Sequence, residues 1–363
     1  MDLIRRKQFL EEIKAWREKE IIKVVTGVRR SGKSTLFSLY IDELKSDGVT
    51  NEQLVFVNFD EIEFESLKNY KALYEYVKKR ILPDKMTYIF LDEAQDCTEF
   101  EKAVSNLYLK KNVDIYLTGS NANMLSGDLA TKLTARYIQI DMMPLSFAEY
   151  TEAVNIADKR ERFNRFMNWG AFPYAARMID TFRSNNQYLE GVYDTVLVRD
   201  ILQRKKTQDA ALLKSIAAFL ASNIGNSVSS KKIADTLTSN GRPTGVATVE
   251  NYLEALCDAY LFYKVARYDI KGKLHLKTEG KYYICDTGLR NMILGTQGQD
   301  IGHQIENIAY LELLRRGYTV NIGKSGRDTE IDFVAVGDNG TEYYQVSASV
   351  LDENTLTREL TPL

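Results

Sequence analysis

Residues Gly27–Ser34 read GVRRSGKS and match the phosphate-binding pattern GxxxxGK[ST] at every fixed position. An apolar stretch, Ile21–Thr26, precedes this loop, and Thr35–Lys45, with apolar residues at helical spacing, follows it. A strand, a glycine-rich turn and a helix N-terminus together direct backbone N–H groups and the positive end of a helix dipole toward one point. We therefore expect Lys33 to neutralise β- and γ-phosphate charge and the Ser34 hydroxyl to bind Mg²⁺. The loop residues predicted to contact the nucleotide are Gly27, Val28, Arg29, Arg30, Ser31, Gly32, Lys33, Ser34 and Thr35.

Two adjacent carboxylates, Asp92 and Glu93, end another apolar run, Tyr88–Leu91. Ligands of parallel α/β sheets bind at the carboxyl ends of the strands. We expect Asp92 to hold the hydrated Mg²⁺ and Glu93 to act as the general base on the attacking water. Phosphoryl transfer needs mainly a cation, a lysine and one positioned base, so this set is sufficient, and the adjacent acids favour hydrolysis.

A third apolar run, Asp114–Asn121, ends in small polar residues. Thr118, Ser120 or Asn121 could contact the γ-phosphate or orient the water. Serine and asparagine at such a position equally cap a turn. Both alternatives stay open, and we take Ser120 as the predicted nucleotide contact.

Composition limits the class of protein. The chain has 363 residues, of which 44% are hydrophobic, enough for two or three domains with their own cores. A net charge of −2 and a pI near 6.0 give no overall basic field for nucleic acid. Three well-separated cysteines and two histidines argue against a disulfide framework and a zinc site. Without a signal peptide or an apolar run of membrane-spanning length, we expect a cytoplasmic protein.

Apolar runs alternate with helical patterns up to residue 150, which predicts a parallel sheet covered by helices on both faces. We assign residues 1–150 to this core. Ser146 and Glu149 have capping-box spacing, so a helix should begin at Ser146. Residues 151–209 are mostly helical, with a break at Trp169–Pro173, and are expected to form a helical lid.

Residues 210–290 have the layout of a winged helix: a helix capped near Ser229, a second apolar-striped helix, and two strands joined by a turn at Gly272. The second helix carries acids and has no lysine or arginine between Thr244 and Tyr263, whereas duplex binding needs cations near phosphates. A protein or intramolecular contact is therefore favoured. Three nearby basic residues keep DNA contact open: Lys231, Lys232 and Arg242.

Several sequence blocks together resemble one known family, the bacterial and archaeal AAA-type P-loop ATPases that carry a C-terminal domain of unknown function. The blocks are GVRRSGKST, YIFLDEAQD, YLTGSNANML, LTARY, PLSFAEY, VRDIL, CDTGLR, IENIAYLELLRRGY, EIDFVAV and YYQVSAS. They cover nearly the whole chain. The resemblance implies ATP and Mg²⁺ as cofactors and agrees with the roles of Lys33, Ser34, Asp92 and Glu93 given above. ATP is preferred over GTP also because no guanine-reading Asn-Lys-x-Asp motif is present.

By the same resemblance Arg136, in LTARY, is a candidate for the arginine that contacts the γ-phosphate. It would act in cis or from a neighbouring subunit, so a homo-oligomer is possible, and such an arginine is worth roughly 10³–10⁵ in rate. The alternative is an arginine at a strand edge that pairs with an acid.

Residues 291–363 resemble a restriction-endonuclease-like module. Glu306 and Asp332 match its metal-binding acids, but Gln345 and Ser347 stand where a glutamate and a lysine are expected. We therefore predict an inactive module. The sequence at Asp338–Gly340 predicts a hairpin turn. The sequence stops at Leu363, where we expect relatives to continue for another strand and helix.

The leading hypothesis is a Mg²⁺-dependent ATPase whose nucleotide state is coupled to its C-terminal domains and to an unidentified protein client. One alternative is a nucleotide-gated regulator that binds DNA or protein with little hydrolysis. Another is an ATP-dependent nuclease, which the altered acid and lysine positions disfavour.

Overall fold

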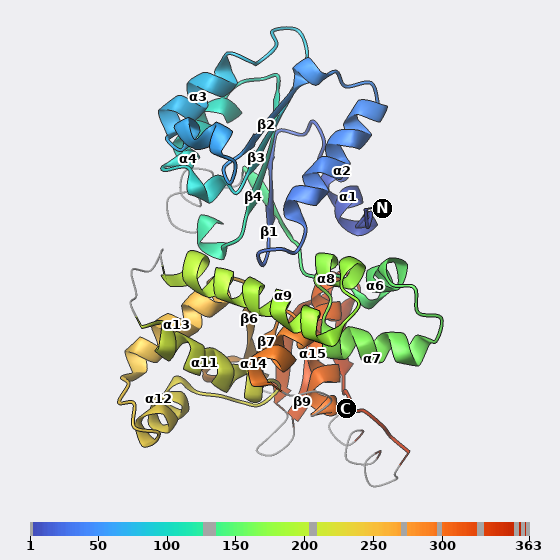
Figure 1. The fold of residues 1–363 in the computed structure, drawn as a ribbon, viewed down its shortest axis with the longest axis vertical. Coiled ribbons are helices and arrows are strands. Elements are labelled where there is room, and N and C mark those ends of the chain that lie inside the picture. Colours follow the sequence, from blue (N-terminus) through green and yellow to red (C-terminus); the bar gives the residue numbers. More distant parts are fainter. Residues whose placement is uncertain are drawn as a thin grey trace. The chain divides into compact units, whose positions relative to one another are not determined.

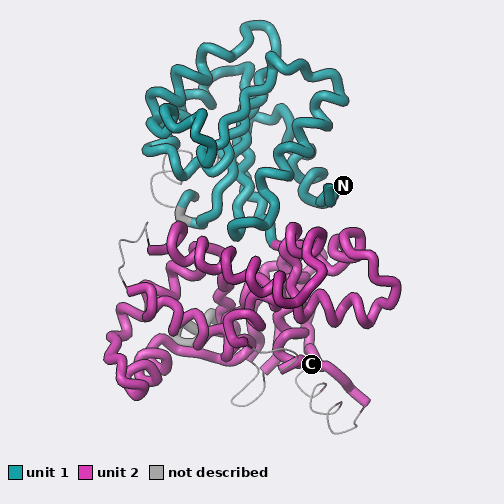
Figure 2. The backbone as a smooth tube through the Cα atoms, in the orientation of Figure 1, with its two compact units in different colours: residues 1–143 teal, residues 144–363 magenta. Residues whose placement is uncertain are grey.

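The computed structural model describes residues 3–125, 136–202, 209–269, 274–295, 300–324 and 330–351, together with residues 356 and 360. The chain forms two compact units, residues 1–143 and 144–363 (Figure 2). The four-part division that the sequence suggests is finer than this and stays a prediction.

The first unit is built around a sheet of five strands. They are β1 (Ile22–Thr26), β2 (Leu54–Asn58), β3 (Thr87–Asp92), β4 (Val113–Gly119) and β5 (Tyr137–Asp141). Their order across the sheet is β2-β3-β4-β1-β5, and every neighbouring pair is parallel. The register places Thr26 beside Gly119 and Asn58 beside Asp92, so the carboxyl ends of these strands lie at the same end of the sheet. The predicted parallel sheet is confirmed.

Helices cover both faces of this sheet (Figure 1). Helices α1 (Lys7–Ala15) and α2 (Lys33–Ser46) pack on one face, and α3 (Tyr70–Lys78) and α4 (Phe100–Tyr108) on the other. Successive strand residues point to opposite faces, so Phe90 lies in the core under α2 whereas Leu91 lies in the core under α3 and α4. The short 3-10 turns are η1 (Asn51–Gln53), η2 (Ile62–Leu67), η3 (Ala94–Asp96) and η4 (Ala122–Leu125).

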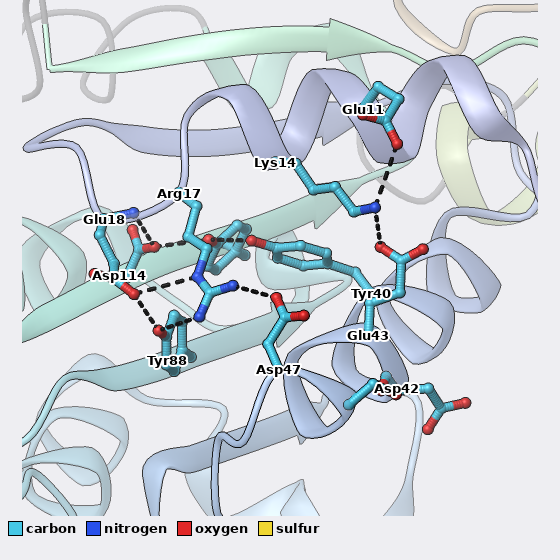
Figure 3. Close-up of polar contacts among 12 residues, drawn as sticks. Glu11, Lys14, Arg17, Glu18, Tyr40, Asp42, Glu43, Asp47, Tyr88 and Asp114 are labelled. Carbon is cyan, nitrogen blue, oxygen red and sulfur yellow. Dashed lines mark hydrogen bonds and ion pairs between the residues drawn. The ribbon is translucent and has the colours of Figure 1, made fainter.

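A buried polar network fixes the segment between α1 and β1 against the sheet (Figure 3). Lys23 on β1 forms an ion pair with Asp114 on β4, and both side chains are fully buried. Asp114 also accepts hydrogen bonds from the Tyr116 hydroxyl, at 2.7 Å, and from the Glu18 N–H, at 2.8 Å. Burial lowers the pKa of Lys23 and Asp114 opposes this shift. Tyr40 on α2 extends the network through its hydroxyl, 3.1 Å from that of Tyr116.

The second unit begins with a series of helices. They are α6 (Phe147–Ala153), α7 (Lys159–Trp169), α8 (Pro173–Met178), α9 (Phe182–Thr195), the π-helical η5 (Val196–Leu202), α11 (Ala210–Ser222), α12 (Ser230–Ser239), α13 (Val246–Asp258), α14 (Thr287–Leu294) and α15 (Ile301–Arg315). Ser146 and Glu149 form the predicted capping box at the start of α6, and Ser229 caps α12. Within the described part of the chain, no helix has both the length and the apolar character that crossing a membrane requires.

The second unit also contains a mixed sheet. Its strands are β6 (Phe262–Asp269), β7 (Leu274–Ile284), β8 (Thr319–Lys324), β9 (Glu330–Gly337) and β10 (Gly340–Tyr344), in the order β10-β9-β8-β6-β7. The predicted hairpin between β9 and β10 is present, with Gly337 beside Gly340. The hairpin β6–β7, predicted as a wing, also forms, but β6 pairs on its other edge with β8 in parallel. Strands assigned to two modules therefore share one sheet. The predicted turn at Gly272 lies outside the described residues.

A buried carboxylate joins distant parts of the second unit. Asp286 accepts hydrogen bonds from the Leu289 N–H, at 2.8 Å, and from the Ala171 N–H, at 2.6 Å. Gly170 (φ 84°) lies so close that a Cβ there would be 2.2 Å from an Asp286 oxygen. Burial raises the pKa of Asp286 to about 6, against the effect of these backbone hydrogen bonds. Asp286 thus both caps α14 and holds the turn before α8.

The raised pKa of Asp286 gives the second unit a specific pH dependence. The folded chain keeps the proton up to about pH 6, whereas the unfolded chain, with the ordinary value of 3.8, loses it earlier. The free energy of unfolding should therefore fall as pH rises from 4 to 6, by up to about 3 kcal/mol from this group. Chemical denaturation of wild type and of Asp286→Asn across this range measures the difference between them.

The exposed Asp180 offers a control with the same change in charge. Asp180→Asn should follow wild type, whereas the stability of wild type relative to Asp286→Asn should decline with rising pH. Parallel curves for wild type and Asp286→Asn would contradict the assignment.

Candidate nucleotide-binding site

The loop Gly27–Ser34 connects β1 to α2, and two of its glycines have conformations that other residues rarely adopt. Gly27 has φ 143° and Gly32 has φ 103°. A Cβ on Gly27 would lie 2.0 Å from the carbonyl oxygen of Met142. Gly32 precedes the first turn of α2, and within the described residues no side chain caps that turn. The first N–H groups of α2 are therefore available to an anion.

Lys33 is the first residue of α2 and folds back over the loop. It is buried, and its Nζ donates hydrogen bonds to the carbonyls of Gly27, at 3.0 Å, and Val28, at 3.3 Å. The same Nζ lies 3.9 Å from Oε1 of Glu93. The structure thus brings the predicted lysine and the predicted base together.

The two acids stand at the carboxyl end of β3 and share one partner on β4. The Thr118 hydroxyl donates to Oδ1 of Asp92 and accepts the N–H of Glu93 at 2.8 Å. Glu93 has φ 52°, a left-handed conformation that turns its side chain away from the strand direction. Thr118, Ser120 and Asn121 were the three candidates after the third apolar run. Of these, Thr118 positions the two acids.

Asp92 is fully buried, and burial raises the pKa of its carboxyl, whereas the nearby hydroxyls of Thr118 and Ser34 lower it. Its Oδ2 is buried and has no hydrogen-bond partner among the described residues. Ser34 is exposed at the start of α2. An unpartnered carboxylate oxygen near a serine hydroxyl is the kind of oxygen pair that Mg²⁺ binds, so these residues fit the ion.

Glu93 lies in a strongly positive setting. Burial alone would raise its pKa, but Lys33 and Arg29 outweigh burial and lower it. Gln95, on η3, donates a hydrogen bond to Oε2 of Glu93 and lies 3.5 Å from the Ser120 hydroxyl. Ser120 thus lies beside Gln95, and its hydroxyl also lowers the pKa of Glu93 by a hydrogen bond to that carboxylate. Gln95 was missed from the sequence, although its place two residues after Glu93 was a usable signal.

Comparisons with known proteins agree with this geometry. The sequence matches an AAA domain family over residues 19–151 and a domain of unknown function, DUF8612, over residues 160–300. It is 38% identical to an uncharacterized protein of Haemophilus influenzae, over 97% of this chain and 88% of that protein. The chain belongs to a family of AAA-type P-loop ATPases with a C-terminal domain of unknown function. An uncharacterized protein of Methanocaldococcus jannaschii is 29% identical, over 93% of this chain and 77% of that protein.

A solved structure extends the similarity to the fold. The Walker-type ATPase of Pyrococcus abyssi superposes with a TM-score of 0.55, covering 80% of this chain and 95% of that chain. At 14% sequence identity this likeness concerns the fold alone. The expected P-loop nucleotide-binding fold is confirmed.

Arg136 lies at the amino end of the parallel strands, opposite the end that carries the nucleotide loop. Its carbonyl accepts the N–H of Ile22, so it is aligned with the start of β1, whereas the loop follows the end of β1 at Thr26. At about 3.3 Å per residue, the length of β1 separates the two positions. The Arg136 guanidinium instead lies over the Tyr108 ring, 5.3 Å from its centroid. This placement is incompatible with action in cis, and action from a neighbouring subunit stays a prediction.

Arg6 is a buried residue of the first unit that sequence reasoning missed. Its guanidinium donates to the carbonyl of Ser31 in the loop, at 3.0 Å, and to that of Met143, at 2.8 Å. It lies just before α1 and carries no motif that would have identified it. Arg6 therefore ties the nucleotide loop to the last residue of its unit.

A second charged cluster lies in the C-terminal domain and includes Glu306 and Asp332, whose match to metal-binding acids stays a prediction. Both face Lys281 of β7, whose Nζ is 3.1 Å from Glu306 and 3.8 Å from Asp332. The same ammonium is 2.9 Å from Glu330. Gln345, in the position expected for a glutamate, accepts the N–H of Asp332 at 3.2 Å. A lysine from another strand thus neutralises these three acids.

Removing the Lys281 ammonium should strongly destabilise the C-terminal domain. Burial alone would lower the pKa of Lys281, but Glu306 and Glu330 outweigh it and raise the pKa, so the ammonium is charged at neutral pH. Breaking a buried ion pair by removing one partner costs about 3–5 kcal/mol. Lys281→Met should lower the free energy of unfolding by this amount, measured by chemical denaturation at pH 7.

Lys264, an exposed lysine on the adjacent strand β6, provides the matched control. Lys264→Met should change the free energy of unfolding by less than about 0.5 kcal/mol. Equal effects of the two substitutions would show that Lys281 does not hold the acids.

Proposed function

We propose that the chain hydrolyses ATP to ADP and phosphate in a Mg²⁺-dependent reaction, and that its nucleotide state is coupled to the C-terminal domain. One observation carries the proposal. Lys33, Asp92 and Glu93 converge beside the loop, with Lys33 3.9 Å from Glu93 and both acids bonded to Thr118. Phosphoryl transfer needs a lysine, a metal-binding acid and a base, and here all three lie at the carboxyl end of the sheet.

Binding would use groups of the loop, of α2 and of the carboxyl end of β3. The N–H groups of the loop and of the first turn of α2 would cradle the phosphates. Lys33 would exchange the carbonyls of Gly27 and Val28 for β- and γ-phosphate oxygens, which carry more charge. Ser34 and Asp92 would hold Mg²⁺, which when bound neutralises charge that develops between the β- and γ-phosphates.

Glu93 would act as the general base. Its carboxylate accepts a proton from water while the water oxygen attacks the γ-phosphorus and the bond to the β–γ bridging oxygen breaks. The lowered pKa keeps Glu93 ionised at neutral pH, so it is ready to accept that proton. Gln95 would hold the carboxylate in place, and Ser120 would support Gln95.

The coupling would start where the loop meets the end of β5. The N–H of Met142 donates to the carbonyl of Thr26 at 2.7 Å, and Gly27 contacts Met142 directly. Residue 144 is the first of the second unit. A change of loop conformation on nucleotide binding would therefore act on the main chain that enters the C-terminal domain.

Two substitutions separate binding from hydrolysis. Lys33→Ala should abolish binding of Mg-ATP, measured by calorimetry, because the phosphates lose their buried cation. Glu93→Gln should leave Mg-ATP binding within a few-fold of wild type but lower phosphate release by about 10²-fold or more, because the base is lost.

Lys110→Ala removes an exposed lysine after α4 and is the control for the charge lost in Lys33→Ala. Equal, low phosphate release by wild type and Glu93→Gln would exclude hydrolysis at this site. If both still bind Mg-ATP, the alternative function of a nucleotide-gated regulator would be favoured.

Arg136 can be tested by mixing subunits. If Arg136 acts on a neighbouring subunit, Arg136→Ala and Glu93→Gln should each be inactive alone, and a mixture should recover part of the wild-type rate. Recovery is expected because an Arg136→Ala subunit keeps Glu93 and can receive Arg136 from a neighbouring Glu93→Gln subunit. An Arg136→Ala variant with the wild-type rate would exclude the role altogether.

A further inference from the structure

Arg29, the third residue of the nucleotide loop, is held by two acids. Its side chain is only 8% exposed. One guanidinium nitrogen lies 3.7 Å from Oε2 of Glu93, and the other donates to Oδ2 of Asp60 at 3.4 Å. Asp60 lies just after β2, so the guanidinium bridges groups at the ends of two neighbouring strands. The adjacent Arg30 is exposed.

These contacts restrain the proposed base. Oε2 of Glu93 faces Arg29 and also accepts the hydrogen bond from Gln95. Oε1 of Glu93 lies 3.9 Å from Lys33. Both carboxylate oxygens thus face cations of the loop. Arg29 and Lys33 therefore compete with a water molecule for this carboxylate.

The contacts of Arg29 with Glu93 and Asp60 are also long. Close charge-assisted hydrogen bonds between nitrogen and oxygen measure about 2.7–2.9 Å, which is shorter than both of these contacts. A guanidinium matches two phosphate oxygens in a bidentate geometry, which a loosely held carboxylate pair does not offer. A γ-phosphate brought into the loop would therefore compete well for Arg29, and a diphosphate lacks that group.

We propose that Arg29 is a positioning residue that senses the triphosphate: the γ-phosphate draws it away from Glu93 and Asp60, and Glu93 is then released toward water. This inference rests on the proposed ATPase function. It explains why an arginine inside the loop faces the acids of the same site. It also makes release of the base depend on the group that is to be cleaved.

Nucleotide discrimination tests the proposal. Calorimetry should compare Mg-ADP with a Mg complex of a non-hydrolysable ATP analogue. Arg29→Gln should weaken binding of the analogue at least tenfold more than binding of ADP, and Arg29→Lys should restore part of the difference. Arg80→Gln, which removes an exposed arginine after α3 with the same change in charge, should leave the preference unchanged.

Asp60→Asn provides a test with the opposite sign. It removes one competitor for the guanidinium and leaves Arg29 in place, so the preference for the analogue over ADP should rise about two- to fivefold. A purely structural role of Arg29 predicts equal weakening of both nucleotides by Arg29→Gln and no gain in Asp60→Asn. That result, or unchanged binding in both variants, would overturn the proposal while the ATPase function stands. Failure of wild type to bind either nucleotide would overturn both.

Discussion

Parallel pairing of β1, β3 and β4 is the constraint on which the nucleotide site depends. The register brings the loop after Thr26, the acids after Leu91 and the hydroxyl of Thr118 to one edge of the sheet. The Thr118 hydroxyl has one proton, which it donates to Asp92. Its oxygen accepts the hydrogen bond from the N–H of Glu93, so the two acids bond to Thr118 in different ways. That second hydrogen bond supports the left-handed backbone of Glu93, a conformation that costs about 1–2 kcal/mol for a residue with a Cβ.

The first unit contains two charged networks that differ in how completely they are satisfied. Asp114 has an ion pair with Lys23 and hydrogen bonds from Tyr116 and the Glu18 N–H, and buried charge needs such partners. Asp92, equally buried, keeps one oxygen without a partner among the described residues. The first network is typical of a structural ion pair, whereas the second has capacity left for a ligand. Burial and charge alone do not separate the two.

Local signals in the sequence were sufficient for the core of the site. The loop, Asp92 and Glu93 are recognisable because each is defined by neighbours within a few residues. The sequence left open whether Arg136 acts in cis or from a neighbouring subunit, because that depends on which end of β5 the residue occupies and where that end lies in the sheet. Lys281 was missed for a similar reason, since only the tertiary fold brings β7 next to the acids of α15 and β9.

In the fold, too, features set by neighbouring residues were predictable from the sequence, whereas contacts between distant segments were not. Caps at Ser146 and Ser229 and the hairpin turn before Gly340 were predicted from short motifs, and all three are present. The parallel pairing of β6 with β8 was not predicted, because strand β7 and two helices separate these strands in the sequence and pairing across such a distance leaves no periodic signal. The strands of two expected modules are consequently parts of one sheet.

The absence of a side chain at Gly27 has a mechanical consequence. Two stretches of main chain touch there without a compressible layer of side chains between them, and Arg6 clamps the same two stretches a few residues further on. Rotamer changes cannot take up a small displacement at a junction of this kind. A displacement of the loop would therefore be passed to Met142 and Met143 through main-chain contact and the Arg6 hydrogen bonds.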